Sequence, residues 1–196
     1  MKRLASLTLF AGFAAFGTTL IAVDVPALSQ TAEVIVVGTV RASAPRLTKD
    51  GARIITDTEI QITEVLKGKP DATTLVVMQP GGIVGDVGQK VEGTASFAVG
   101  EEVVVFLDRR GADRFAVTAM SQGKFRVERS SDGKVAFAVP QHSTSLLIDP
   151  LTQKETVSGL KTMPLADLKT KIAAALATPT SPVVQPTRPA LNKTTP

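Results

Sequence analysis

The chain has 196 residues, of which 43% are hydrophobic, and it carries a formal net charge of +4 with one histidine and no cysteine. This length is enough for one domain with a packed core. The lack of cysteine excludes disulfides, lipoprotein acylation and thiol chemistry, and one histidine provides no usual zinc-ligand set, so we expect no metal and no cofactor. The two signs of charge are interspersed and Tyr and Trp are absent, which disfavours nucleic-acid partners and carbohydrate-binding modules.

The first 29 residues have the layout of a secretory signal peptide. Lys2 and Arg3 precede an uncharged apolar run over residues 4–23, and Ala27 and Ser29 place small side chains at the −3 and −1 positions of a cleavage motif. Cleavage after Ser29 would remove residues 1–29 and leave a chain with no membrane span.

Two alternatives to this cleavage stay open. The motif Val25-Pro26-Ala27 is a second possible cleavage site, and the run over residues 4–23 is long enough to span a bilayer as an uncleaved anchor. Glycines and threonines dilute this run, which favours cleavage. We therefore expect a bacterial protein exported to the periplasm or the extracellular space.

The middle of the chain has the pattern of an antiparallel β-barrel or sandwich. Short β-branched runs and period-two alternation follow one another between turn signals, with no helical pattern between them. We expect strands at 32–41, 53–66, 73–78, 96–99, 103–107, 114–120, 124–128 and 134–139, with a turn-rich connection at 42–51. The contiguous run Val34-Ile35-Val36-Val37 predicts a strand that is buried on both faces. Gly38 predicts a close approach of another backbone segment, and Thr63-Glu64 predicts a β-bulge.

The period changes only near the C-terminus. Residues 164–177 place Leu165, Leu168, Ile172 and Leu176 on one helical stripe after Pro164, which predicts a helix covering one end or face of the barrel. Residues 178–196 contain five of the twelve prolines and predict a disordered Pro/Thr tail. The expected organisation is thus a signal peptide at 1–29, a β-barrel domain at 30–177 and a tail at 178–196.

A glycine-rich segment follows the third expected strand. A phosphate-binding loop would require a helix directly after it, whereas the residues that follow look extended. We interpret the glycines as positions that permit positive φ in a long hairpin or loop, and we expect this segment to be an adaptable contact surface for a partner. Its candidate contact residues are Gly81, Gly82, Gly85, Asp86 and Gly88.

No set of residues predicts catalysis. His142 lies beside Ser143 and Ser145, but no GxSxG motif accompanies it, so a surface-loop histidine is favoured over a small hydrolase. Asp57 and Glu59 share a strand face, which we interpret as a solvated face paired with Lys or Arg rather than a glycosidase pair. We assign no catalytic residue.

The order of several motifs resembles a known group of proteins. The segments are 33–40 (EVIVVGTV), 58–68 ending in Lys-Gly, Gly81-Gly82, 97–107 (FAVGEEVVVFL) and 122–125 (QGKF). Together they resemble uncharacterised exported bacterial proteins and are more distantly similar to the netrin-like modules of tissue inhibitors of metalloproteinases. The resemblance covers residues 32–127 and implies a five-stranded barrel of the oligonucleotide/oligosaccharide-binding type. Those inhibitors chelate zinc through an N-terminal cysteine, which this chain lacks, so their mechanism does not carry over.

These observations predict an exported, non-enzymatic binding protein that contacts another protein or a cell-envelope component. One alternative is a protease-directed module, an inhibitor or chaperone of a secreted metalloprotease that acts through loops at the barrel rim. Others are a small hydrolase around His142 and an exported nucleic-acid-binding barrel. The oligomeric state and the ligand are left open.

Overall fold

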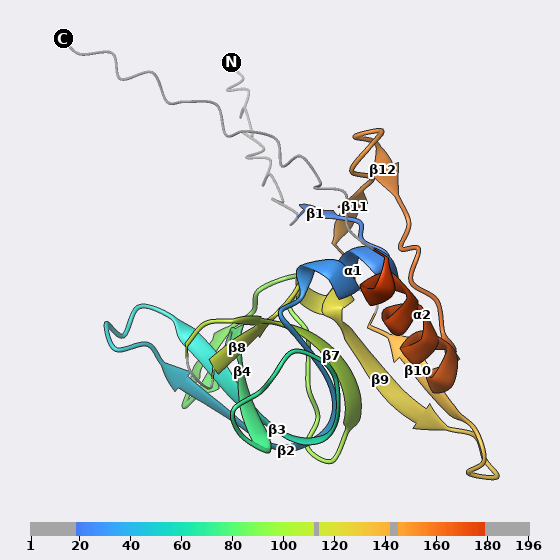
Figure 1. Ribbon diagram of the computed structural model, residues 1–196. Coiled ribbons are helices and arrows are strands. Elements are labelled where there is room, and N and C mark those ends of the chain that lie inside the picture. Colours follow the sequence, from blue (N-terminus) through green and yellow to red (C-terminus); the bar gives the residue numbers. More distant parts are fainter. Residues whose placement is uncertain (1–18, 112–113, 142–144, 179–196) are drawn as a thin grey trace, which may run out of the picture.

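The computed structural model describes residues 19–111, 114–141 and 145–178. Most of the expected leader, the histidine at position 142 and the expected tail beyond Thr178 lie outside these described residues. Figure 1 shows a barrel on one side and a layer of two helices and a hairpin on the other.

The barrel is built from five strands and confirms the expected mainly-β fold. They are β2 (Val34–Leu47), β3 (Ile54–Lys67), β4 (Thr74–Pro80), β7 (Glu102–Arg109) and β8 (Arg114–Val117). Antiparallel pairing runs in the order β7-β2-β3-β4, and β8 closes the barrel by pairing antiparallel with β7 and parallel with β4. The parallel closure departs from the wholly antiparallel barrel that the sequence predicts.

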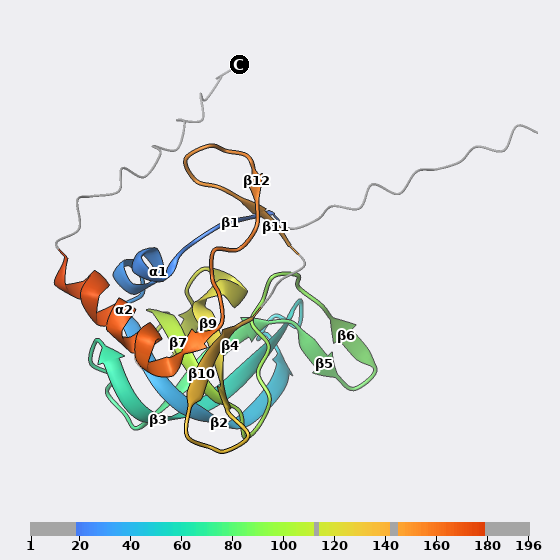
Figure 2. The same cartoon turned by 90° about the vertical axis from the view of Figure 1, so that its right-hand side faces the viewer.

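The other elements extend or cover this barrel. Beyond β7 the sheet continues through β9 (Lys124–Arg129), β10 (Ala136–Pro140) and β13 (Met163–Pro164). A separate hairpin, β5 (Gly82–Val84) and β6 (Val87–Gln89), stands off the barrel (Figure 2). A small sheet joins β1 (Thr19–Ile21), β11 (Leu146–Ile148) and β12 (Glu155–Thr156). The helices are α1 (Val25–Thr31), the 3-10 turn Met120–Gly123 and α2 (Leu165–Ala177).

Two hydrophobic cores share the barrel wall. Val34 and Val36 of β2 face the barrel interior, whereas Ile35 and Val37 face the layer formed by α1, α2 and the β9–β10 hairpin. All four side chains are buried, which confirms the predicted burial on both faces. Since β7 alternates in the same way, the wall made by β2 and β7 is packed from both sides.

The sequence predicts a C-terminal helix over one end or one face of the barrel. In the structure α2 covers a face, namely the outer side of this wall. It begins after Pro164 and buries Leu168, Ile172 and Ala175. Leu176, which the sequence places on the buried stripe, is 38% exposed, so that part of the prediction is wrong. The buried residue of this last turn is Ala175 instead.

Strand boundaries differ from the prediction in several places. The strand expected at 114–120 ends at Val117, because the chain then turns into the 3-10 helix Met120–Gly123. β2 continues to Leu47 through the expected turn, because past Thr39 it leaves β7 and pairs only with β3. This free edge tolerates Pro45, which has no N–H to donate. Residues 96–99 form no strand.

The predicted irregularities of the β2–β3 pair are confirmed. The register skips Thr63 between the pairs Val37↔Glu64 and Gly38↔Ile62. A Cβ at Gly38 would lie 2.6 Å from the Gln61 carbonyl oxygen, so only glycine permits this close approach.

The structure shows a helix, α1, at the end of the expected leader. Asp24 caps it by accepting a hydrogen bond from the Ala27 N–H at 2.8 Å, and Pro26 occupies its first turn. Within the described part of the chain, neither helix has the length and apolar character needed to cross a membrane.

Candidate functional site

A pocket of about 440 Å³ opens at the end of the barrel from which the β5–β6 hairpin leaves. Strands β2, β3 and β4 form its floor, the hairpin base one wall, and the loop between β6 and β7 the other. Its lining consists of Ser43, Thr56, Thr58, Gln79–Gly82, Gln89–Phe97 and Gln141. Barrel mouths are frequent ligand sites, and this volume lies in the usual range of about 300–1,000 Å³.

The barrel interior becomes polar where it meets this pocket. Leu75, Val77 and Gln79 occupy the inward positions of β4, with Gln79 nearest the pocket, and Thr58 of β3 is buried beside them. Gln79 is 8% exposed, and its Nε2 has no hydrogen-bond partner among the described residues. An unpaired buried amide costs about 1–3 kcal/mol, so this donor is a candidate ligand contact.

The base of the hairpin is fixed to β3. The Gly81 N–H donates to the Ile54 carbonyl at 2.8 Å, and the Gly81 carbonyl accepts from Thr56 Oγ1 at 2.7 Å. The side-chain oxygen of Gln89 accepts from the Ile54 N–H at 2.7 Å. These bonds hold the pocket wall in place.

Two of the glycines predicted to contact a partner belong to this fixed base. Gly81 and Gly82 have φ values of +100° and +136°, and a Cβ at Gly82 would lie 2.6 Å from the Thr56 hydroxyl oxygen. Both glycines line the pocket. Their role is therefore close packing in a strained backbone region, in addition to the positive φ expected from the sequence.

The other three predicted contact residues lie on the projecting part of the hairpin. Gly85 has a φ of +57° and occupies the first position of the two-residue turn, with Asp86 at the second, as a type II′ turn requires. Gly88 lies opposite Ile83 in β6. The structure thus separates the five candidates into a fixed base and an exposed tip. Figure 2 shows the β5–β6 hairpin that carries them.

The hairpin tip carries exposed apolar side chains. Ile83 and Val87 are 69% and 62% exposed. They belong to neighbouring cross-strand pairs, Ile83↔Gly88 and Val84↔Val87, so they point to opposite faces of the hairpin. An exposed apolar tip beside a polar pocket is a suitable contact surface for a partner.

The wall facing the hairpin is held by a buried ion pair. Lys124, which is 4% exposed, donates to both carboxylate oxygens of Glu101 at 2.8 Å and to the Ser96 carbonyl. Its ammonium lies 4.7 Å from the Phe97 ring centroid. Burial lowers the pKa of Lys124, and the hydrogen bond and charge of Glu101 oppose this shift.

Gln141 reinforces the same wall. Its side-chain oxygen accepts from the Ser96 N–H at 3.0 Å, and its Nε2 donates to the Thr94 carbonyl at 3.3 Å. The loop that lines the pocket is therefore fastened by side chains from β9 and from the end of β10.

The charges of the pocket lining are balanced. Lys90 and Glu92 form an ion pair of 2.6 Å at the rim, and the other described lining residues are uncharged. This arrangement favours a neutral ligand with hydrogen-bonding groups over a phosphate or a carboxylate.

The sequence reasoning missed Gln79, Lys124 and Gln141. A signal for Gln79 was present, since it continues the alternation of Leu75 and Val77 and so places an amide at an interior position. No comparable signal marks Lys124, because the alternation of β9 assigns it to the face opposite Phe125 without showing that this face is covered.

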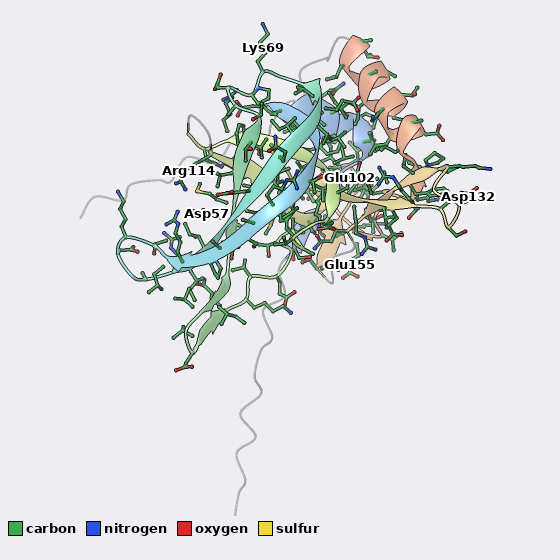
Figure 3. All side chains as sticks on the ribbon, turned by 90° about the horizontal axis from the view of Figure 1, so that it is seen from below. Asp57, Lys69, Glu102, Arg114, Asp132 and Glu155 are labelled. Carbon is green, nitrogen blue, oxygen red and sulfur yellow. The ribbon has the colours of Figure 1, made fainter. Side chains whose placement is uncertain are left out.

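The expected pairing of the acidic strand face is found at Asp57, whereas Glu59 is exposed and forms no ion pair with the other described residues. Asp57 is paired with Arg46 at 2.7 Å and with Arg114 at 3.4 Å, and Figure 3 shows Asp57 and Arg114 on the same side of the barrel. In the described part of the chain, no three His, Asp or Glu side chains gather as a metal site would require. His142 lies outside the described residues.

No protein-family model matches this chain, and no curated protein matches it. The similarity to netrin-like modules therefore stays a prediction from the motifs. The closed barrel establishes a fold class, and function has to be argued from the site.

Proposed function

We propose that this chain is an exported, non-enzymatic binding protein whose partner is an extended polypeptide segment. A main-chain carbonyl of the partner accepts a hydrogen bond from Gln79 Nε2 in the barrel-mouth pocket, while apolar partner side chains contact Ile83 and Val87 at the hairpin tip. The unpaired buried amide of Gln79 is the observation that carries this proposal.

The chemistry of the two neighbouring surfaces favours a polypeptide over a glycan. A polypeptide alternates neutral amides with apolar side chains, which matches a neutral polar pocket beside an apolar hairpin tip. A glycan would be better served by Tyr or Trp platforms, and the chain contains neither.

The hairpin also provides backbone groups for an extended partner. In the described part of the chain β6 pairs only with β5, so its outer edge has main-chain donors and acceptors available. Addition of a strand to such an edge gives affinity through main-chain hydrogen bonds, while neighbouring pockets give specificity.

The proposal is tested by photo-cross-linking at the hairpin turn. Asp86→benzoylphenylalanine leaves Ile83 and Val87 intact, and Leu151→benzoylphenylalanine, at a position that is 91% exposed, is the matched control. In the native envelope fraction, we expect a discrete adduct from position 86 that is absent from position 151, that a protease digests and that the additional change Gln79→Leu weakens at least tenfold.

Other adducts would contradict the proposal. An adduct that only a glycosidase digests would show a glycan partner, and equal labelling from both positions would show no specific site. Capture of a metalloprotease with loss of its activity would instead support the protease-directed alternative, and substrate turnover by the purified chain would refute a non-enzymatic role.

A further inference from the structure

Residues at the end of the expected leader are part of the folded domain. Helix α1 buries Val25, Leu28 and Ser29, with Leu28 at 1% and Ser29 at 0% exposure. The two apolar side chains belong to the same core cluster as Leu168 and Ile172 of α2, and Figure 1 shows α1 and α2 side by side above the barrel wall. Cleavage after Ser29 would remove all three buried residues of α1 from the domain.

Polar contacts also tie this segment to the barrel. The Lys67 ammonium donates to the carbonyls of Ser29 and Gln30 at 2.8 and 2.9 Å. It is partly buried, and this burial lowers the pKa of Lys67. Without Ser29 it would lose one of two acceptors in a site where a charged amine needs them.

The buried side chain of Gln122 depends entirely on residues before α1. Its Oε1 accepts from the Val23 N–H at 3.1 Å, and its Nε2 donates to the Ile21 carbonyl at 2.9 Å. At 4% exposure, Gln122 would be left with neither of these partners if the mature chain began at Gln30.

We propose that the export leader ends at Gly17, so that β1 and α1 belong to the mature domain. This inference rests on the export part of the proposed function. Ala15-Phe16-Gly17 places small residues at the −3 and −1 positions, and the uncharged run over residues 4–16 has the length of a signal-peptide apolar region, about 7–15 residues. Cleavage there leaves Thr18 first and preserves every contact described above.

This assignment gives Asp24 and Pro26 a role in the folded domain. As the end of a leader they would break an apolar run, whereas in the structure they cap and begin α1. The same sequence therefore has two explanations, and the buried contacts of α1 decide between them.

The test is the N-terminus of the exported protein. The full chain with a C-terminal tag is expressed in a bacterial host with Sec export, and the periplasmic product is examined by intact mass and N-terminal sequencing. We expect a single mature form that begins at Thr18. A mature form that begins at any later residue, such as Leu28 or Gln30, would overturn the proposal while leaving export intact. Uncleaved chain in the cytosol would overturn export as well.

Two variants locate the cleavage motif independently of folding. Gly17→Leu places a bulky residue at the −1 position, and we expect precursor to accumulate at least fivefold in a pulse-chase experiment. Ala27→Gln alters the −3 position of the downstream motif, and we expect its processing rate to equal that of the wild type. The reverse pattern would assign cleavage to Ser29.

Discussion

Two buried glutamines allow a matched test of the barrel-mouth pocket. Gln79 and Gln122 are 8% and 4% exposed, but the Nε2 of Gln79 is unpaired among the described residues, while Gln122 makes a hydrogen bond through each side-chain polar atom. Replacing each by leucine removes the same amide group from two buried sites, one where the amide N–H has no hydrogen-bond partner and one where both polar atoms are hydrogen-bonded. The two variants should therefore change the free energy of unfolding in different directions.

The structure sets the magnitudes. Gln79→Leu removes an unpaired buried donor, which is worth about 1–3 kcal/mol, and adds an apolar side chain next to Leu75 and Val77. We expect a free energy of unfolding that is unchanged or raised by about 1 kcal/mol. Gln122→Leu breaks two hydrogen bonds and leaves backbone groups of Ile21 and Val23 unpaired, so we expect a loss of about 1–3 kcal/mol.

Urea denaturation followed by far-ultraviolet circular dichroism measures both values, since the chain has no Trp or Tyr to report by fluorescence. The combination that supports a binding site is a Gln79→Leu variant that is at least as stable as the wild type yet loses the cross-link at the hairpin turn. A destabilisation of about 2 kcal/mol by Gln79→Leu would refute the reasoning, because it would show that this amide is already satisfied within the folded chain.

Four further predictions concern the walls of the site and the layer behind it. Lys124→Met should lower the free energy of unfolding by about 3–5 kcal/mol, because it leaves the Glu101 carboxylate without its cation and with only the Ala98 N–H as a donor. Adding Glu101→Gln should recover most of this loss in urea titrations. Burial lowers the pKa of Lys124 below its ordinary value of 10.5. Between the folded-state pKa and 10.5 the unfolded chain therefore binds more protons than the folded chain, so the free energy of unfolding should rise with pH in this range. A fall of the free energy of unfolding in this range would contradict the lowered pKa of Lys124. In calorimetry, Gly82→Ala should lower Tm more than Gly85→Ala, because a Cβ at position 82 meets the Thr56 hydroxyl at 2.6 Å whereas a Cβ at position 85 meets no atom within 4 Å. Leu28→Ala should lower the free energy of unfolding by about 2–5 kcal/mol if α1 belongs to the mature domain.

Local patterns in the sequence predict most of the barrel. The Val34–Val37 run and the alternation of β9 and β10 identify strands because period two and β-branching are properties of a few neighbouring residues. The parallel contact of β8 with β4 could not be predicted, since it depends on how the barrel closes. The predicted burial of Leu176 is wrong because the buried residues of α2 depend on what packs against this helix. One of its neighbours is α1, most of which the sequence assigned to a leader.

The features of the candidate site likewise divide into those that local sequence predicts and those that depend on the tertiary structure. The glycine-rich segment is visible in the sequence because glycine itself marks unusual backbone, and Gly81 and Gly82 do line the pocket. The pair Lys124–Glu101 and the unpaired amide of Gln79 were not visible, because their significance arises only when separate strands and loops enclose them. A polar residue at an interior position of an apolar alternation, as Gln79 is, indicates a candidate binding position.

The positions of the polar and apolar residues explain how one small barrel can be both rigid and open. Its wall is packed on both faces by two cores that share β2 and β7, so the unpaired amide of Gln79 does not need to contribute to stability. Hydrogen bonds from Thr56 and Gln89 hold one side of the pocket, and Lys124 and Gln141 hold the other. A ligand entering this pocket would meet groups that are already in place, so binding would require little further ordering, and the exposed hairpin tip is left to adapt to the partner.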